Sequence, residues 1–392
     1  MPKYDTRSGA ACEPPNTSRH IEDAYEAVER AAAQAAAAAA EVDRNARFPH
    51  EAVTSLREGR LLNAAAPTHL GGLGLTIEQL VDVGGRIARS CGTSAMIWAM
   101  HQVQLACVAR HHPDAPLLAR ILAEQWLIAS VTSEVGIGGD LRSSRASVNS
   151  ADNGVHTLEK QASTVSYGAD AQAFLVTARR DADAAPSSQV AVLVGREQVA
   201  LEQTGQWNTL GMRGTCSPPF SLTMRFSPGQ ILPVPFGQIA ASTMVPMSHV
   251  LWAAVWAGMA DEALDRAARA ARRRSAPGDD VSDLAVAHAR LAGVRAQLDA
   301  AVHVVKPVLE GTAEPTLALT VQLNALKISM SETVVDVVRL ALAVCGMVGF
   351  SEDGPYSVAR ILRDAFSAPL MIGNGRLITS NSQMLLLRGG IR

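Results

Sequence analysis

The order in which hydrophobic patterns change along the chain limits the fold more than any other sequence feature. Residues 18–110 repeat apolar side chains at helical spacings of three and four, including an alanine-rich run from Ala31 to Ala40. Between 127 and 226, short β-branched or alternating apolar segments are separated by Gly, Ser, Asp and Pro, which is typical of strands. Helical periodicity then returns in three long stretches, about 242–274, 281–308 and 316–346.

This order predicts an α+β protein with three domains. We expect an N-terminal all-helical domain (1–127), a middle antiparallel β-domain (128–239) and a C-terminal four-helix bundle (240–392). A shorter helix near 355–366 is expected after the three long ones. Long apolar helices of this kind need a partner surface, so we also expect a homotetramer.

Composition excludes several classes of function. The formal net charge of −2 gives no general reason to bind nucleic acid. Charged residues or histidines interrupt every long apolar window, which argues against a membrane span. Five scattered cysteines without C-x-x-C spacing argue against a disulfide framework, and the polar N-terminus lacks the apolar core of a signal peptide. We therefore expect a cytoplasmic protein, and no His, Cys or carboxylate spacing predicts a metal site.

One glycine-rich segment carries the strongest chemical signal. It reads Ser133-Glu134-Val135-Gly136-Ile137-Gly138-Gly139-Asp140 and lies at the start of the predicted β-domain. Small residues let the backbone approach a flat ring or a pyrophosphate closely, and the serine hydroxyl is available for hydrogen bonding.

Other short motifs are distributed along the rest of the chain. They are Gly71-Gly72-Leu73-Gly74, Thr164-Val165-Ser166-Tyr167, Gly211-Met212-Arg213-Gly214-Thr215, Arg274 before Pro277-Gly278, Gly346-Met347-Val348-Gly349-Phe350 and Arg363-Asp364-Ala365. With the glycine-rich segment and the domain order, they resemble the acyl-CoA dehydrogenase superfamily over roughly residues 45–380.

The resemblance implies a non-covalent FAD between the β-domain and the bundle, with Arg274 reaching the cofactor of a neighbouring subunit. The residues that it assigns to cofactor binding are Ser133, Glu134, Gly138, Gly139, Ser166, Arg274, Gly346, Asn374 and Arg376. Gly139 stands where the family has a serine, and Thr164 stands where it has a tryptophan that covers the flavin.

The sequence departs from the family at the catalytic base. Counting from Arg363-Asp364-Ala365, Ile372 occupies the position of the glutamate that removes the α-proton of an acyl thioester, and a hydrocarbon side chain accepts no proton. The alternative family position carries Ser248 and His249. The candidates for a replacement base are His101, His249 and Glu134, although a lone histidine on an apolar helix is also typical of a hydrogen-bonded core residue. The predicted substrate pocket contains Trp98, Met371, Ile372 and Gly373.

Three functions remain open at this point. The resemblance implies an FAD-dependent oxidoreductase acting on an acyl thioester, bound to CoA or a carrier protein, with an electron-transfer flavoprotein or a flavin reductase as partner. The missing base also suits a flavin-dependent monooxygenase of the same fold, which uses reduced flavin and oxygen. The third alternative is a non-redox shell, by which we mean a protein that uses this fold only to bind a ligand or to catalyse a non-oxidative reaction.

Overall fold

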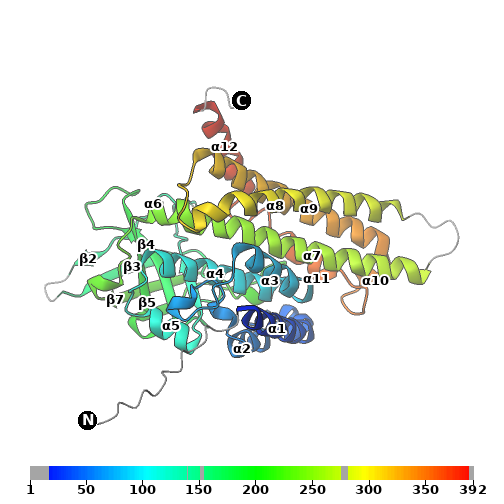
Figure 1. The fold of residues 1–392 in the computed structure, drawn as a ribbon, viewed down its shortest axis with the longest axis horizontal. Coiled ribbons are helices and arrows are strands. Elements are labelled where there is room, and N and C mark those ends of the chain that lie inside the picture. Colours follow the sequence, from blue (N-terminus) through cyan, green and yellow to red (C-terminus); the bar gives the residue numbers. More distant parts are fainter. Residues whose placement is uncertain (1–16, 139, 151–153, 275–280, 388–392) are drawn as a thin grey trace, which may run out of the picture.

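A computed structural model describes residues 17–138, 140–150, 154–274 and 281–387. Gly139, one of the predicted cofactor contacts, lies outside the described residues. Figure 1 shows the strands gathered at one end of the molecule, beside a set of long, roughly parallel helices.

The N-terminal domain is helical, as the sequence predicts. Its helices are α1 (Thr17–Asn45), α2 (His50–Glu58), α3 (Ile77–Ser90), α4 (Gly92–His111) and α5 (Leu118–Glu124). Helix α3 begins with a capping box, in which Thr76 and Gln79 satisfy each other's backbone N–H groups. Helix α4 is buried on nearly all sides and connects this domain to both of the others.

The middle domain contains two sheets. One has the order β1 (Ile128–Val131), β4 (Ala173–Arg179), β5 (Gln189–Gly195), and the other has the order β2 (Asn149–Ser150), β3 (His156–Ala162), β7 (Phe220–Phe226), β6 (Val199–Gln203). The second sheet is antiparallel, but β1 pairs with β4 in parallel, with Ile128 opposite Ala173. The purely antiparallel prediction is therefore wrong for this pair. Between β1 and β4 the chain crosses to the other sheet to form β2 and β3, so it re-enters in the same direction as β1.

Three long helices form the C-terminal domain. The chain enters through α6 (Phe236–Ile239) and the π-helical turn η6 (Ala240–Met244), which continue directly into α7 (Val245–Arg274). Helices α8 (Ser282–Leu309) and α9 (Leu317–Cys345) pack beside α7. In place of a fourth long helix, the short α10 (Met347–Phe350), α11 (Ala359–Ala365) and α12 (Asn374–Leu387) pack against α9.

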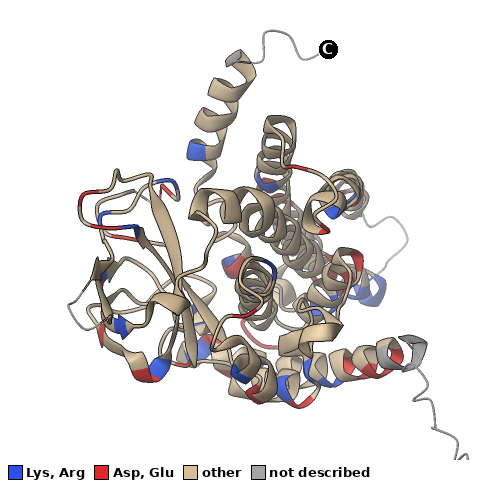
Figure 2. Cartoon of the chain, turned by 60° about the vertical axis from the view of Figure 1, so that its left-hand side comes forward, with Lys and Arg blue, Asp and Glu red and all other residues tan. Residues whose placement is uncertain are grey.

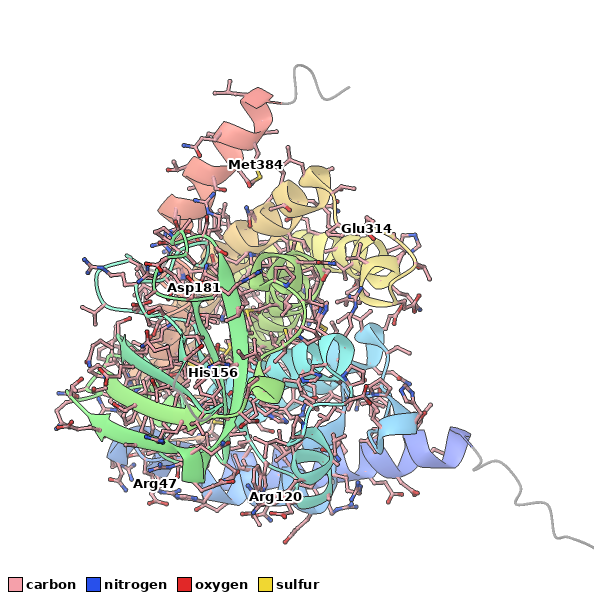
Figure 3. The ribbon with its side chains drawn as sticks, turned by 90° about the vertical axis from the view of Figure 1, so that its left-hand side faces the viewer. Arg47, Arg120, His156, Asp181, Glu314 and Met384 are labelled. Atoms are coloured by element: carbon pink, nitrogen blue, oxygen red, sulfur yellow. The ribbon has the colours of Figure 1, made fainter. Side chains whose placement is uncertain are left out.

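Helix α12 extends away from the rest of the protein (Figures 1 and 2). Its only charged residue is Arg376, and Met384, labelled in Figure 3, lies on the projecting part. Leu386 in its last turn is 85% exposed.

One helix in the described part of the chain, Phe236–Arg274, is long and apolar enough to cross a membrane. Within its most apolar window, 78% of the residues are buried against the rest of the protein. Such burial is typical of a core helix, so this is weak evidence for a membrane span.

Candidate functional site

Three loops of the β-domain bring several hydroxyl groups together. Ser133, just after β1, donates to the carbonyl oxygen of Thr164 (2.6 Å) and accepts from the Thr164 N–H (3.1 Å). Ser217, before β7, donates to Ser166 Oγ at 2.9 Å. The hydroxyl of Ser133 is therefore engaged within the protein by two bonds. Among the described residues, Ser166 has Ser217 as its one hydroxyl partner, and Ser217 also bonds Thr215. Of the two predicted serines, Ser166 is the better placed to contact a ligand.

Glu134 holds the glycine-rich segment in place. Its buried carboxylate accepts from the backbone N–H groups of Arg145 and Ala146 and from Ser144 Oγ, at 2.7–3.1 Å. The buried ammonium of Lys160 lies 3.8 Å away. With its oxygens used in this way, the carboxylate closes the 134–146 loop. This geometry argues for a structural role and against the predicted role as a base.

His101 and Trp98 lie in the core of the N-terminal domain. His101 Nε2 donates to the Leu62 carbonyl (2.7 Å), Nδ1 accepts from the Ile128 N–H (3.1 Å), and burial lowers the pKa of the imidazole to about 4. Trp98 is fully buried, and its indole N–H donates to the Leu61 carbonyl. Neither side chain has a free polar atom for a substrate, so the geometry argues against a base at His101 and a pocket at Trp98.

A second set of residues meets where α7, α9 and the start of α12 come together, and we call it the Lys327 cluster. Lys327, fully buried on α9, donates to the Ile372 carbonyl oxygen (3.1 Å) and to Asn374 Oδ1 (2.7 Å). Burial lowers the pKa of its ammonium group to about 8, while Glu332 acts in the opposite direction. Asn374 also bonds Ser331 and Glu332, both on α9.

The cluster joins residues that the sequence assigned to separate roles. Ile372 and Asn374 were predicted as pocket and cofactor residues, and the Lys327 ammonium bonds both. Ile372 has φ +46°, an unusual conformation for a β-branched residue, and its carbonyl is held by Lys327. Met371, Ile372 and Gly373 are all half-buried, so this turn reaches the protein surface.

His249 belongs to the same region. Its Nδ1 donates to the Val245 carbonyl at 3.0 Å, while its buried Nε2 makes no hydrogen bond of good geometry, although the Asn324 side chain lies within reach of the ring. The ring stacks on Trp252, with centroids 6.2 Å apart. Burial, with a contribution from the Lys327 charge, lowers the pKa of the imidazole to about 4, so the ring is neutral at pH 7. Of the three candidate bases, His249 alone has an unused ring nitrogen or carboxylate oxygen.

Arg274 and Gly346 lie elsewhere. Arg274 donates to the Val344 carbonyl, and a Cβ on Gly346 would lie 3.2 Å from its guanidinium. At 1.5 Å per residue, this end of α9 is about 20 Å from Ser331 in the Lys327 cluster. Figure 1 places the end of α7 on the side of the helices away from the strands. Within one chain, Arg274 and Gly346 are therefore separated from Asn374.

The glycine-rich segment approaches α12. Arg376 is close enough to Asp140 to help lower the pKa of that carboxyl group. Gly136 and Gly138 have φ of +86° and +59°, and a Cβ at Gly138 would meet no atom within 4 Å. The open space beside Gly138 and the singly bonded Ser166 hydroxyl suit a flat, hydrogen-bonding ring such as a flavin. Ser166, Gly138 and Arg376 are the predicted cofactor residues best placed to hold it.

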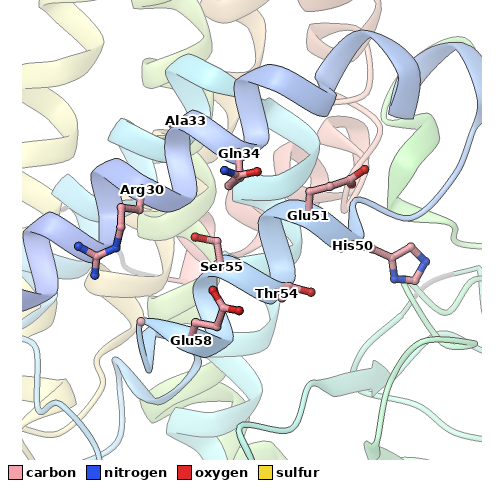
Figure 4. A pocket seen from close by; sticks show the side chains of 9 residues that line it. Arg30, Ala33, Gln34, His50, Glu51, Thr54, Ser55 and Glu58 are labelled. Atoms are coloured by element: carbon pink, nitrogen blue, oxygen red, sulfur yellow. The ribbon is translucent and has the colours of Figure 1, made fainter.

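Two further features of the described residues bear on the site. A groove of about 700 Å³ lies between α1 and α2 (Figure 4), lined by residues such as Arg30, Gln34 and Glu58. None of the predicted site residues lines it. In the described ranges, no group of three His, Cys, Asp or Glu side chains is arranged to hold a metal ion.

The comparisons with known proteins match both terminal domains. The acyl-CoA dehydrogenase N-terminal domain matches residues 18–116, and the acyl-CoA dehydrogenase C-terminal domain matches residues 237–382. Probable acyl-CoA dehydrogenase fadE25 of Mycobacterium tuberculosis is 24% identical over 357 residues, 89% of this chain and 90% of the relative.

Several relatives have other activities in their names. The chain is 29% identical over 185 residues to L-evernosamine nitrososynthase of Micromonospora, which covers 46% of this chain and 44% of that relative. It is 27% identical over 348 residues to amino sugar nitrososynthase DnmZ of Streptomyces peucetius, 84% of each chain.

Solved structures share the fold. The FMN-bound dibenzothiophene monooxygenase TdsC of Paenibacillus has a TM-score of 0.82 at 20% identity, covering 94% of this chain and 98% of that one. Butyryl-CoA dehydrogenase of Megasphaera elsdenii has a TM-score of 0.80 at 18% identity, covering 98% and 100%. Because both terminal domains match and the three-domain architecture is shared, the chain belongs to the acyl-CoA dehydrogenase superfamily, whose members are flavin-dependent oxidoreductases and monooxygenases.

Proposed function

We propose that this protein is a flavin-dependent monooxygenase that transfers one oxygen atom from O₂ to a small substrate. The observation that carries the proposal is the Lys327 cluster. The position expected for a catalytic glutamate is Ile372, and the group held against its backbone is the ammonium of Lys327. An ammonium group accepts no proton. The one carboxylate of the cluster, the exposed Glu332, bonds Asn374, so no carboxylate occupies the position from which the family's base removes the α-proton of an acyl thioester.

Oxygen transfer from reduced flavin and O₂ requires no carboxylate base of this kind. In the overall reaction, reduced flavin supplies two electrons, one oxygen atom of O₂ enters the substrate, and the other leaves as water. Burial and neutral polar groups suit this chemistry because they keep bulk water away from the reacting atoms. His249, neutral and with the Asn324 side chain within reach of its ring, could accept a hydrogen bond at Nε2 from a substrate hydroxyl or amine.

The relatives support this choice over dehydrogenation. TdsC is named as a monooxygenase and was solved with FMN, and KijD3 was solved with FMN and a dTDP-linked 3-amino sugar. Nitrososynthases acting on amino sugars are among the matched sequences. We therefore propose FMN as the flavin and an amine or another electron-rich heteroatom as the acceptor of oxygen. A flavin reductase is then the expected partner.

Isotope labelling tests the function directly. The holoenzyme is reduced by NADH and a flavin reductase, mixed with ¹⁸O₂ and one of three probes, and the products are analysed by mass spectrometry. The probes are dTDP-3-amino-2,3,6-trideoxy-4-keto-3-methyl-D-glucose, dibenzothiophene and indole. The dTDP sugar was solved bound to KijD3 and indole bound to TdsC, and dibenzothiophene appears in the name of TdsC. One ¹⁸O atom per product molecule is the expected result.

Two outcomes contradict the proposal. Unmodified probes with all oxygen recovered as peroxide, together with rapid anaerobic bleaching of the flavin by butyryl-CoA, would identify a dehydrogenase. A colourless protein that rejects both FMN and FAD would instead favour the non-redox shell.

A further inference from the structure

The protein contains two fully buried lysines, and they differ in one respect. Lys160 lies 3.8 Å from the carboxylate of Glu134 and also donates to Thr177. Lys327 has two neutral oxygen acceptors, and no carboxylate lies within 4 Å of its ammonium among the described residues. Glu332, exposed and bonded to Asn374, raises the pKa of Lys327 by its charge without contacting the ammonium. A buried ammonium without a counter-ion in direct contact is costly, so an anion bound beside Lys327 would be stabilised.

Two hydrogen-bond donors without a partner lie on α7, the helix whose Trp256 ring contacts this charge. The protein has five tryptophans, and the indole N–H groups of Trp98, Trp126 and Trp207 each donate to an oxygen. Those of Trp252 and Trp256 are buried and unpaired. The Lys327 ammonium lies over the face of the Trp256 ring, 5.9 Å from its centroid, and the Trp252 ring centroid is 6.5 Å from that of Trp256.

These observations fit one kind of ligand. An anionic group can neutralise the ammonium, and a ligand that extends along α7 can also offer an acceptor to an unpaired indole N–H group. His249 Nε2, also unpaired, would then sit beside a negative charge that favours its protonation. The half-buried turn 371–373 borders the cluster on its outer side.

We propose that Lys327, with Trp252 and Trp256, forms a binding site for an anionic group of a ligand, of carboxylate size, between α7, α9 and the turn at Ile372. The inference rests on the proposed function only in taking the ligand to be the substrate or the reduced flavin. Anion binding is measured independently of oxygen transfer, so one can fail without the other.

Calorimetry on the oxidised holoenzyme tests the site. The probes are cyclohexanecarboxylate and its neutral counterpart cyclohexanecarboxamide. We expect the wild type to prefer the carboxylate by about tenfold or more, and Lys327→Met to lose that preference. Lys306→Met is the matched control, since Lys306 is a partly exposed lysine paired with Glu78 on the neighbouring surface. It should retain the wild-type preference.

A second measurement separates the two sources of the anion. If the anion is the reduced flavin, Lys327→Met lowers the flavin midpoint potential relative to Lys306→Met, and neither probe is preferred by the wild type. If it belongs to the substrate, the potential is unchanged and the carboxylate preference is lost. An unchanged potential combined with no carboxylate preference in the wild type, or with a preference that survives in Lys327→Met, overturns the proposal.

Should Lys327→Met fail to fold, the wild type still provides the test. In protein labelled with ¹³C at lysine Cε, the Lys327 signal is assigned by its loss in Lys327→Arg. It should shift on addition of the carboxylate, or on flavin reduction, and not on addition of the amide. A signal that responds to neither anion contradicts the proposal.

Discussion

Asp364 on α11 accepts a hydrogen bond of 2.6 Å from the backbone N–H of Met212 in the β-domain. Both residues are buried, and Met212 has φ +52°, a conformation that needs support. The neighbouring Gly211 packs so closely on α11 that a Cβ there would lie 2.1 Å from the Arg363 carbonyl oxygen. The Arg363-Asp364-Ala365 motif therefore fastens the β-domain to the C-terminal helices.

Removing this acceptor should destabilise the protein. In Asp364→Ala the buried Met212 N–H loses its partner, which should lower the free energy of unfolding by about 1–3 kcal/mol. Asp364→Asn keeps an acceptor oxygen and should lose less. Urea denaturation of the two variants measures the difference, and equal losses would show that the hydrogen bond is not the cause.

The same carboxyl group predicts a pH dependence. Burial raises the pKa of Asp364 to about 6 from 3.8, although Arg360 opposes the shift. The folded protein thus holds this proton more tightly than the unfolded chain, so the stability that Asp364 contributes falls as pH rises from about 4 to about 6 and is constant above that. Relative to Asp364→Asn, the wild type should become less stable across that window. Parallel stability curves for the two proteins would contradict this.

Glu134 should affect flavin retention through the loop that it closes. In Glu134→Gln, the amide N–H₂ group faces the Ser144 hydroxyl and the backbone N–H donors that bond the carboxylate in the wild type. We expect the free energy of unfolding to fall by about 2 kcal/mol and flavin occupancy to be lower. Glu159→Gln is the control, since Glu159 is exposed on β3 beside the same lysine. The ratio of flavin to protein absorbance gives the result, and equal occupancy in the two variants would count against this role.

The helices were predictable because their apolar residues follow the helical period, and α7, α8 and α9 lie within three residues of the expected ranges. Strand β3 was not predicted, because His156–Ala162 contains Glu159 and Lys160. Lys160 can be buried there because its ammonium lies 3.8 Å from the carboxylate of Glu134, distant in sequence, and donates to Thr177. Sequence patterns do not reveal such tertiary pairing.

The candidate site was predictable only in part. Ile372, Asn374 and His249 do lie in one region, but their link through Lys327 was missed. The available signal was a single lysine in the otherwise uncharged first half of α9, from Leu317 to Ser331. His101 and Trp98 were assigned to the site because residue type alone does not show whether a polar atom is already satisfied. Their partners are backbone carbonyl and N–H groups, which no side-chain pattern encodes.

The proposed cofactor can be identified directly. The resemblance assigned Gly346, Asn374 and, from another subunit, Arg274 to the adenosine half of FAD. Within one chain, Arg274 bonds Val344, about 20 Å along α9 from Ser331, which bonds Asn374. We therefore expect the purified protein to release FMN on denaturation, identified by chromatography against both standards. Release of FAD would instead mean that Arg274 and Gly346 of another subunit complete the site.

Anaerobic mixing with acyl-CoAs tests the central claim, that this fold carries oxygen transfer without a base for dehydrogenation. The oxidised holoenzyme is mixed with butyryl-CoA and longer saturated acyl-CoAs, and flavin absorbance is followed by stopped flow. Ile372→Glu restores a carboxylate in a half-buried position near the Lys327 ammonium, which favours the ionised form that accepts a proton, and Ile372→Gln is the matched control. We predict no bleaching by the wild type or Ile372→Gln, and measurable bleaching by Ile372→Glu. Rapid bleaching of the wild-type flavin by any of these thioesters would contradict the account, because a competent base would then exist in the unmodified protein.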